Sequence, residues 1–164
     1  MIVLGIDPGY AIVGAGAVEY WGSQHRLLEA RAVTTEAGAP FPSRLETIYD
    51  GVSALLERHS PQAMAVEKLF FNTNTTTAID VAQARGVILL AARRYGVPVF
   101  EYTPLQVKQS VVGYGRAEKK QVQEMIRLLL HLTACPKPDD VADALAIAIC
   151  HCHSAGSLMR LARG

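Results

Sequence analysis

Two acidic residues of this chain, Asp7 and Glu67, come directly after short runs of apolar residues. Asp7 comes after residues 2–6, which are apolar and partly β-branched, and before a Pro-Gly turn. Glu67 comes in the same way after residues 63–66. Both runs are predicted strands, and open α/β sheets commonly place their sites at the carboxyl ends of strands. The two carboxylates are therefore candidates for one site, although a turn-capping Asp and a solvated Glu are alternatives for either residue alone.

A third acidic residue lies inside an apolar helical segment. Asp143 is surrounded by the apolar run 141–147, where Asp has poor helix propensity. Asp140 precedes it by three residues, which places both carboxylates on one face of the helix. The helix dipole and N-capping account for Asp139, the predicted N-cap, and partly for Asp140. They do not account for Asp143.

If the strand ends and the helix start converge, the carboxylates of Asp7, Glu67, Asp140 and Asp143 repel one another unless divalent cations hold them ionised. Ligands that are all oxygen favour hard ions, here Mg²⁺ or Mn²⁺. Such clusters hold two ions about 3.5 to 4 Å apart, which activate an attacking water and stabilise the leaving 3′ oxygen of a phosphodiester. The spacing thus predicts phosphoryl chemistry on a nucleic acid, provided that the cluster forms.

The rest of the sequence predicts the elements that position these residues. A helical stripe over 43–59 begins with Ser43 and Glu46 at the spacing of a capping box. The order of strands and helices predicts an α/β fold, a mixed sheet with helices on its faces, in a single domain over residues 1–164. The predicted strands are 2–6, 12–20, 27–34, 63–66 and 99–102, and the predicted helices are 43–59, 76–95, 104–112, 117–132 and 139–154.

The charge is unevenly distributed along the chain. Residues 1–80 carry 5 Lys or Arg against 9 Asp or Glu, whereas residues 81–164 carry 11 against 6. A polyanionic partner would be met mainly by the second half, although charges spread over solvated helix faces are an equal alternative. No apolar run reaches the roughly 20 residues of a membrane helix, and no charged leader is seen. The 3 cysteines suit a reducing compartment, so we expect a cytoplasmic protein without a membrane contact.

Five sequence blocks resemble the signature blocks of the RuvC family of Holliday junction resolvases, in the same order and over nearly the whole chain. They are Gly5 to Gly9, Ala65 to Glu67, Gln83 to Gly86, Val107 to Gln109 and Ala142 to Ala148. The resemblance implies an RNase H-like fold, a mixed five-stranded sheet flanked by helices. It also implies a homodimer, dependence on Mg²⁺ or Mn²⁺ with two ions per active site, and paired symmetric nicks in four-way junction DNA.

The resemblance further implies roles for particular residues. Asp7, Glu67, Asp140 and Asp143 match the family's catalytic, metal-binding carboxylates, although some members carry His at the position of Asp140. Phe70 matches an aromatic residue inserted at the junction centre, and Lys108 and Lys119 match basic residues near the scissile strand. Lys120 is an additional lysine that we expect to contact the DNA backbone, and Lys68 stands where Gln is frequent. The branch-migration proteins RuvA and RuvB are the partners implied.

The residues near two of these positions support DNA contact independently of the resemblance. An exposed Phe70 can stack on an unpaired base, whereas burial in the core is the alternative, favoured for Phe71. The turn 113–116, which ends in Arg116, lies before the lysines at the next predicted helix start and can offer amides and cations to phosphates. A solvated turn is the alternative. Residues 150–153 alternate Cys and His, but consecutive helical residues diverge and cannot share one zinc ion.

Three other functions are compatible with parts of the sequence. A strand that ends in Asp-x-Gly before a hairpin also opens the nucleotide-binding fold of the sugar kinase, actin and Hsp70 group, which needs a second lobe that 164 residues do not accommodate. A junction-binding module with structural carboxylates is the second alternative, and ATP calorimetry and metal titration separate these two from a nuclease. The third is a less selective nuclease of the same fold.

Overall fold

The computed structural model describes residues 1–68 and 77–161 of the chain. Its centre is one five-stranded sheet in the order β3-β2-β1-β4-β5. β1, β2 and β3 are antiparallel neighbours, and β4 and β5 continue the sheet in parallel with β1. The strands are β1 (Ile2–Asp7), β2 (Ile12–Trp21), β3 (Gln24–Thr34), β4 (Ala63–Glu67) and β5 (Val99–Tyr102). The mixed sheet predicted from the sequence is confirmed.

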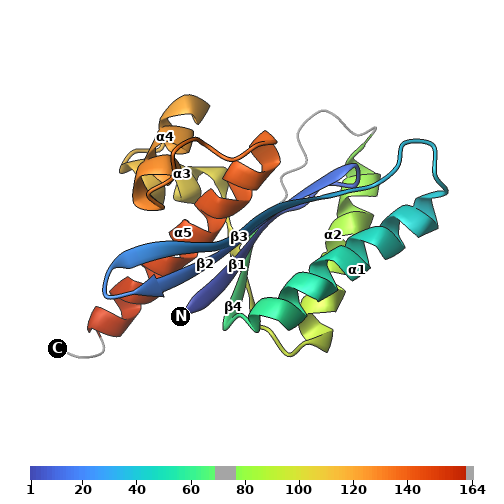
Figure 1. The fold of residues 1–164 in the computed structure, drawn as a ribbon, viewed down its shortest axis with the longest axis horizontal. Coiled ribbons are helices and arrows are strands. Elements are labelled where there is room, and N and C mark those ends of the chain that lie inside the picture. The colour runs from blue at the N-terminus through green and yellow to red at the C-terminus, as the bar shows by residue number, and fades with distance from the viewer. Residues whose placement is uncertain (69–76, 162–164) are drawn as a thin grey trace.

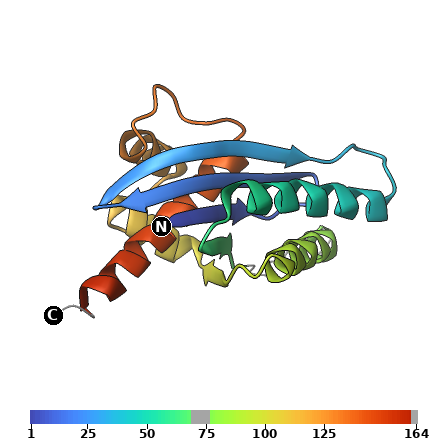
Figure 2. The same ribbon diagram turned by 60° about the horizontal axis from the view of Figure 1, so that its bottom comes forward.

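Helices cover both faces of the sheet (Figures 1 and 2). Two of them, α1 (Phe41–His59) and α2 (Ala78–Arg94), lie together on one face, called here the α1 face. The other face, called the α5 face, carries α3 (Pro104–Val112), α4 (Lys119–Leu129) and α5 (Asp139–Leu161). Because α5 contacts β1, β2, β3, β4 and β5, this long helix is the element that spans the sheet.

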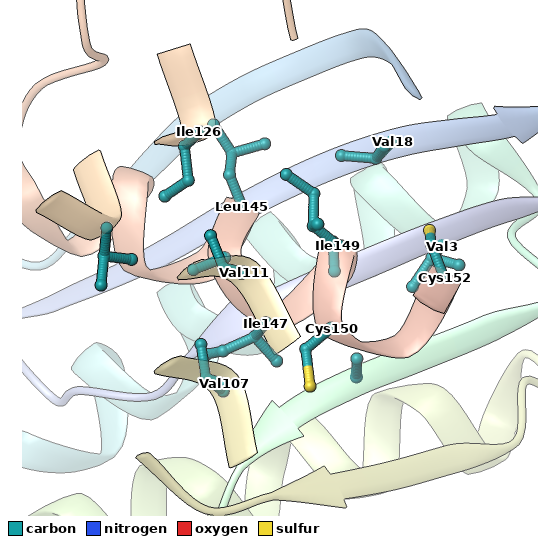
Figure 3. Packing of buried hydrophobic residues seen from close by; sticks show 14 of the residues in the cluster. Val3, Val18, Val107, Val111, Ile126, Leu145, Ile147, Ile149, Cys150 and Cys152 are labelled. Atoms are coloured by element: carbon teal, nitrogen blue, oxygen red, sulfur yellow. The ribbon is translucent and has the colours of Figure 1, made fainter. Parts of the chain in front are cut away.

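Each face of the sheet has its own hydrophobic core. Alternate side chains of a strand point to opposite faces, so Val3 of β1 joins the core under α5 while Leu4 joins the core under α1 and α2. Figure 3 shows the α5-face core, in which Val107 of α3 and Ile147 of α5 lie close together. With both faces covered, β1 and β4 are apolar runs that end only at their acidic residues.

One predicted helix start is wrong. α1 begins at Phe41, with Pro40 as the N-cap residue and no side-chain capping hydrogen bond, so Ser43 and Glu46 do not form a capping box. The N–H of Ser43 already donates to the carbonyl of Pro40 at 3.0 Å. N–H groups in the first turn of a helix have no partner within it, so Pro42 is well placed there without an N–H. The helix can therefore begin earlier than the Ser43 pattern indicates.

Other boundaries differ by a few residues. The β2–β3 hairpin is longer than predicted because Trp21 pairs with Gln24 across Gly22 and Ser23, which both have positive φ. α4 is shorter than the predicted 117–132, and α5 continues past residue 154 to Leu161. Among the described residues, no helix is long and apolar enough to span a membrane.

Candidate active site

Parallel pairing brings Asp7 and Glu67 to the same end of the sheet. Ile6 lies opposite Val66 in the register of β1 and β4, so the next residues, Asp7 and Glu67, are neighbours at the carboxyl ends of the two strands. Val66 packs into the core of the α1 face, and side chains alternate along a strand. Glu67 therefore points to the α5 face, and the same alternation from Ile6 directs Asp7 there as well.

Two glycines allow the start of α5 to approach these strand ends closely. A Cβ atom on Gly14 would collide with the carbonyl oxygen of Asp140, and one on Gly5 would collide with the carbonyl oxygen of Ala144. Gly14 is also the register partner of Asp7 across β1 and β2. Glycine inside a strand often marks such a close approach of another backbone. Gly5 and Gly14 are thus a signal in the sequence, beyond the acidic residues themselves, for the position of α5 beside Asp7.

The charges of the neighbouring carboxylates act on Asp7 and Glu67. Burial is the largest cause that raises the pKa of Asp7 to about 7, and the charges of Glu67, Asp143 and Asp140 raise it further. Burial, followed by the charge of Asp143, also raises the pKa of Glu67. Glu67, Asp140 and Asp143, which the sequence predicts to cluster with Asp7, thus lie within electrostatic reach of it. The four residues Asp7, Glu67, Asp140 and Asp143 are called here the acidic centre.

Lys119 supplies the positive charge next to the acidic centre. Its Nζ lies 3.1 Å from Oδ2 of Asp143 and 3.4 Å from Oδ2 of Asp139. Burial acts to lower the pKa of Lys119, but the hydrogen bond to Asp143 and the acidic charges outweigh it, so the pKa is raised. Lys137 Nζ adds a second contact to Asp139, 2.7 Å from its Oδ1. Asp139, predicted as the residue before the helix, is the first residue of α5, and its carboxylate binds these two lysines.

The chemistry of the acidic centre fits divalent cations. Its ligands are all carboxylates, the type that Mg²⁺ and Mn²⁺ prefer. The acidic charges that, after burial, raise the pKa of Asp7 are charges that cations would neutralise. Within residues 1–68 and 77–161, however, no three Asp, Glu, His or Cys side chains are grouped as they would be around an ion. Metal binding would therefore require these side chains to come closer together, while one oxygen of Asp143 contacts Lys119 in this structure.

The other predicted site residues lie at different distances from the acidic centre. Lys108 of α3 lines a pocket of about 270 Å³ together with Glu67, Lys119 and Asp143. Lys120 and Arg116 are exposed, at the start of α4 and in the turn before it. Phe70, together with Phe71, lies outside the described residues. The structure thus brings Lys108 and Lys119 to the carboxylates and leaves Arg116 and Lys120 on the surface nearby.

The Cys and His residues near the end of α5 have structural partners. Nδ1 of His151 lies 2.8 Å from the hydroxyl of Tyr102. Cys150 and Cys152 are buried in the α5-face core. Burial raises the pKa of Cys152 to about 12, which keeps its thiol protonated. His151 is therefore part of the packing between α5 and β5, and the two cysteines are part of the core under α5.

The sheet order, the helix α5 across its face and the acidic centre at the ends of β1 and β4 define an RNase H-like α/β protein. The family model described as "Crossover junction endodeoxyribonuclease RuvC" matches residues 3–151. The chain belongs to the RuvC family. A relative of that name from Brevibacillus brevis is 62% identical over 151 residues, covering 92% of this chain and 91% of the relative.

Solved structures agree with this assignment. The structure of Thermus thermophilus RuvC in complex with Holliday junction substrate matches with a TM-score of 0.91 and 42% identity, covering 94% of each chain. The yeast mitochondrial Holliday junction resolvase Ydc2 matches with a TM-score of 0.71 over 96% of this chain and 82% of its own. At 16% identity, Ydc2 supports the fold alone. The RNase H-like fold predicted from the sequence is confirmed.

Proposed function

We propose that this chain is a single-domain endonuclease, over residues 1–164, that resolves four-way DNA junctions during homologous recombination and DNA repair. The observation that carries the proposal is the acidic centre of Asp7, Glu67, Asp140 and Asp143 in a chain of the RuvC family. The related T. thermophilus protein has been solved with a Holliday junction. Two nicks, placed symmetrically in opposing strands, would separate the junction into two duplexes.

The acidic centre would hold two Mg²⁺ or Mn²⁺ ions, and such ions supply Lewis-acid activation of the attacking water and of the leaving 3′ oxygen. Asp7 has a pKa of about 7 because of burial and its acidic neighbours. At neutral pH this side chain therefore carries a proton in part of the molecules and must release it to act as a ligand. Asp143, which contacts Lys119 through Oδ2, would contribute a carboxylate oxygen to a metal ion.

The basic residues around the acidic centre would hold the DNA backbone. Lys108 and Lys119 lie at the pocket beside Glu67 and Asp143, where they would contact phosphates of the scissile strand. Lys120 and Arg116 would contact phosphates further away. Since lysine contacts to phosphate carry no sequence information, these residues would set position and affinity. Phe70 would stack on an unpaired base at the junction centre.

Two symmetric cuts require two sites. We therefore propose that the chain acts as a homodimer, because a C2 dimer presents two equivalent acidic centres to the two equivalent strands of an opened junction. RuvA and RuvB would deliver the junction by branch migration, and the complex would act in the cytoplasm. Sedimentation that finds a monomer both free and on a junction would contradict the dimer.

The test of the proposed function is a cleavage assay on four substrates. A mobile four-way junction, a linear duplex, a single strand and a three-way fork are incubated with the protein in Mg²⁺, Mn²⁺ or EDTA. The proposal predicts paired nicks in the junction with either metal and none in EDTA, and little cutting of the other DNAs. Equal cutting of duplex and junction would indicate a less selective nuclease, and junction binding without cutting would indicate a binding module.

A further inference from the structure

A buried hydrogen bond joins α5 to the edge strand β5. Nδ1 of His151 lies 2.8 Å from the hydroxyl of Tyr102, and His151 is only 5% exposed. The ring of His151 also packs on that of Phe100, with the centroids 4.5 Å apart. A hydrogen bond has a narrow range of length and angle, whereas apolar contacts have no preferred direction. The bond between Tyr102 and His151 therefore restricts how α5 can slide along its axis over the sheet.

Tyr102 lies beside Glu67 in the sheet. The two residues are register partners between β4 and β5, and the carbonyl of Tyr102 accepts a hydrogen bond of 2.8 Å from the N–H of Lys68. The side chain of Tyr102 packs against the α5-face core, on the face to which Glu67 points. Paired strands therefore carry the Tyr102 hydroxyl and the Glu67 carboxylate together.

His151 stands on the same face of α5 as Asp143. Ile147 lies midway between them, and residues spaced by four lie above one another on a helix. Because α5 is one continuous helix from Asp139 to Leu161, a shift of the helix at His151 also moves Asp143. Glu67 and Asp143 line one pocket. The hydrogen bond to Tyr102 thus connects the two elements that bring these carboxylates together.

We propose that Tyr102 and His151 are positioning residues, whose hydrogen bond sets how far apart the carboxylates of β4 and α5 stand in the acidic centre. The inference rests on the proposed function, because it treats the acidic centre as a metal site. These carboxylates must come closer together to hold an ion, and the separation of their backbones decides how close they can come. Tyr102 and His151 act through the backbone, since neither residue lines the pocket of Glu67 and Asp143.

Tyr102→Phe removes the hydroxyl and keeps the ring, and two other variants are its controls. Tyr20→Phe makes the same chemical change beside the same core, at a hydroxyl that has no hydrogen-bond partner within residues 1–68 and 77–161. Val18→Ala leaves a cavity in that core opposite Val3, at the end of β1 far from Asp7. The first control reports the effect of losing a hydroxyl, and the second reports the effect of losing stability.

The experiment measures Mn²⁺ affinity by electron paramagnetic resonance without DNA, and urea unfolding of each variant. We expect Tyr102→Phe to bind Mn²⁺ about tenfold more weakly, the lower end of the effect of residues that support metal ligands. Tyr20→Phe and Val18→Ala should bind Mn²⁺ as the unchanged protein does. His151→Leu should match Tyr102→Phe, and the double variant should lose no more, because both changes break one bond. His151→Asn offers an amide to the hydroxyl and should recover most of the affinity.

The outcomes separate the positioning role from the proposed function. If the unchanged protein binds no Mn²⁺, the acidic centre is not a metal site, and the proposed function is wrong together with this inference. If it binds Mn²⁺ and cuts junctions, but Tyr102→Phe binds Mn²⁺ equally well, the function stands and the positioning role is wrong. An equal loss of affinity in Val18→Ala would assign the effect to stability and would also overturn the role. So would equal affinities of His151→Asn and His151→Leu.

Discussion

Gly14 of β2 lies so close to the carbonyl oxygen of Asp140 that a Cβ atom at Gly14 would collide with it. Because Gly14 is also the register partner of Asp7, one contact fixes the distance between the strand end and the start of α5. A side chain here must push the helix backbone away. The geometry of the acidic centre therefore depends on a residue that carries no functional group.

Gly14→Ala should displace the start of α5 and weaken both folding and cutting. Overpacking of this kind costs about 1–3 kcal/mol of stability. Gly16→Ala is the comparison, since its Cβ atom would collide with the side chain of Leu145, whereas the helix backbone would stay at an ordinary contact distance of 3.5 Å. Urea unfolding and Mn²⁺ titration of both variants test this expectation. An unchanged Mn²⁺ affinity in Gly14→Ala would show that this contact does not set the geometry of the acidic centre.

Lys119→Ala and Lys120→Ala together should weaken junction binding and lower its dependence on salt. Each lost phosphate contact reduces the slope of log affinity against log salt by about 0.9. Lys119 has a second effect, because it also neutralises Asp143, so its loss should reduce cutting more than the loss of Lys120. Arg58 of α1 is half exposed on the α1 face and pairs with Glu29. Arg58→Ala should leave the salt slope unchanged, and an equal change would mean that the lysines do not contact DNA.

Phe70→Ala should impair the cutting of a fully paired junction. Stacking of an aromatic residue on an unpaired base contributes roughly 1–3 kcal/mol, and this contact helps to open the junction centre. A junction with mismatches at its centre is already open, so the defect should shrink on that substrate. Cleavage rates on the two junctions decide the question, and the stacking role is unsupported if Phe70→Ala slows both equally.

The stability of the protein should fall as the pH drops from about 6.5 to about 4. Burial, with a smaller contribution from the charge of His153, lowers the pKa of His25 from 6.5 to about 4. As the pH falls, His25 becomes protonated in the unfolded chain while it stays neutral in the folded protein. This difference in protonation removes up to about 3 kcal/mol of stability over this range. The ring centroids of His25 and Tyr20 are 4.9 Å apart, and His25→Phe keeps an aromatic ring at this position. The free energy of unfolding of this variant should depend less steeply on pH, and an identical slope would assign the loss to other groups.

Local sequence signals were sufficient to predict the bounds of elements that begin next to proline. β5 and α3 have the bounds predicted for them, because Pro98 precedes the strand and Thr103 and Pro104 begin the helix. A true capping box links Thr103 and Gln106, whereas the same spacing at Ser43 and Glu46 forms none. The difference is where the residue lies relative to its helix. Thr103 comes directly before α3, whereas Ser43 lies inside α1.

The site was predictable in part for a similar reason. Acidic residues at strand ends and inside an apolar helix can be recognised from the order of residues along the chain. The acidic centre could therefore be proposed from the sequence. The contact of Asp139 with Lys119 and Lys137 could not, because it depends on how the start of α5 lies against α4 and the preceding loop. Nor could the pocket that Lys108 lines, since most of its walls come from three helices whose packing distance no local pattern encodes.

The central claim is that the acidic centre performs the cutting, and Asp143 and Asp139 allow a matched test of it. Both are near the start of α5 and both contact Lys119, but only Asp143 raises the pKa of Asp7 and of Glu67. Asn keeps the size of Asp and removes its charge. Asp143→Asn should therefore lose a metal ligand, while Asp139→Asn should lose only a contact to lysines.

The most direct measurement is the single-turnover rate of junction cleavage in Mg²⁺ by Asp143→Asn and Asp139→Asn, with junction affinity measured in EDTA. Asp143→Asn should cut about 100-fold more slowly or worse, because metal activation contributes several kcal/mol. Its junction affinity should be kept or slightly raised, since a negative charge near the phosphates is gone. Asp139→Asn should cut within a few fold of the unchanged protein. Cleavage by Asp143→Asn at the unchanged rate would contradict the account.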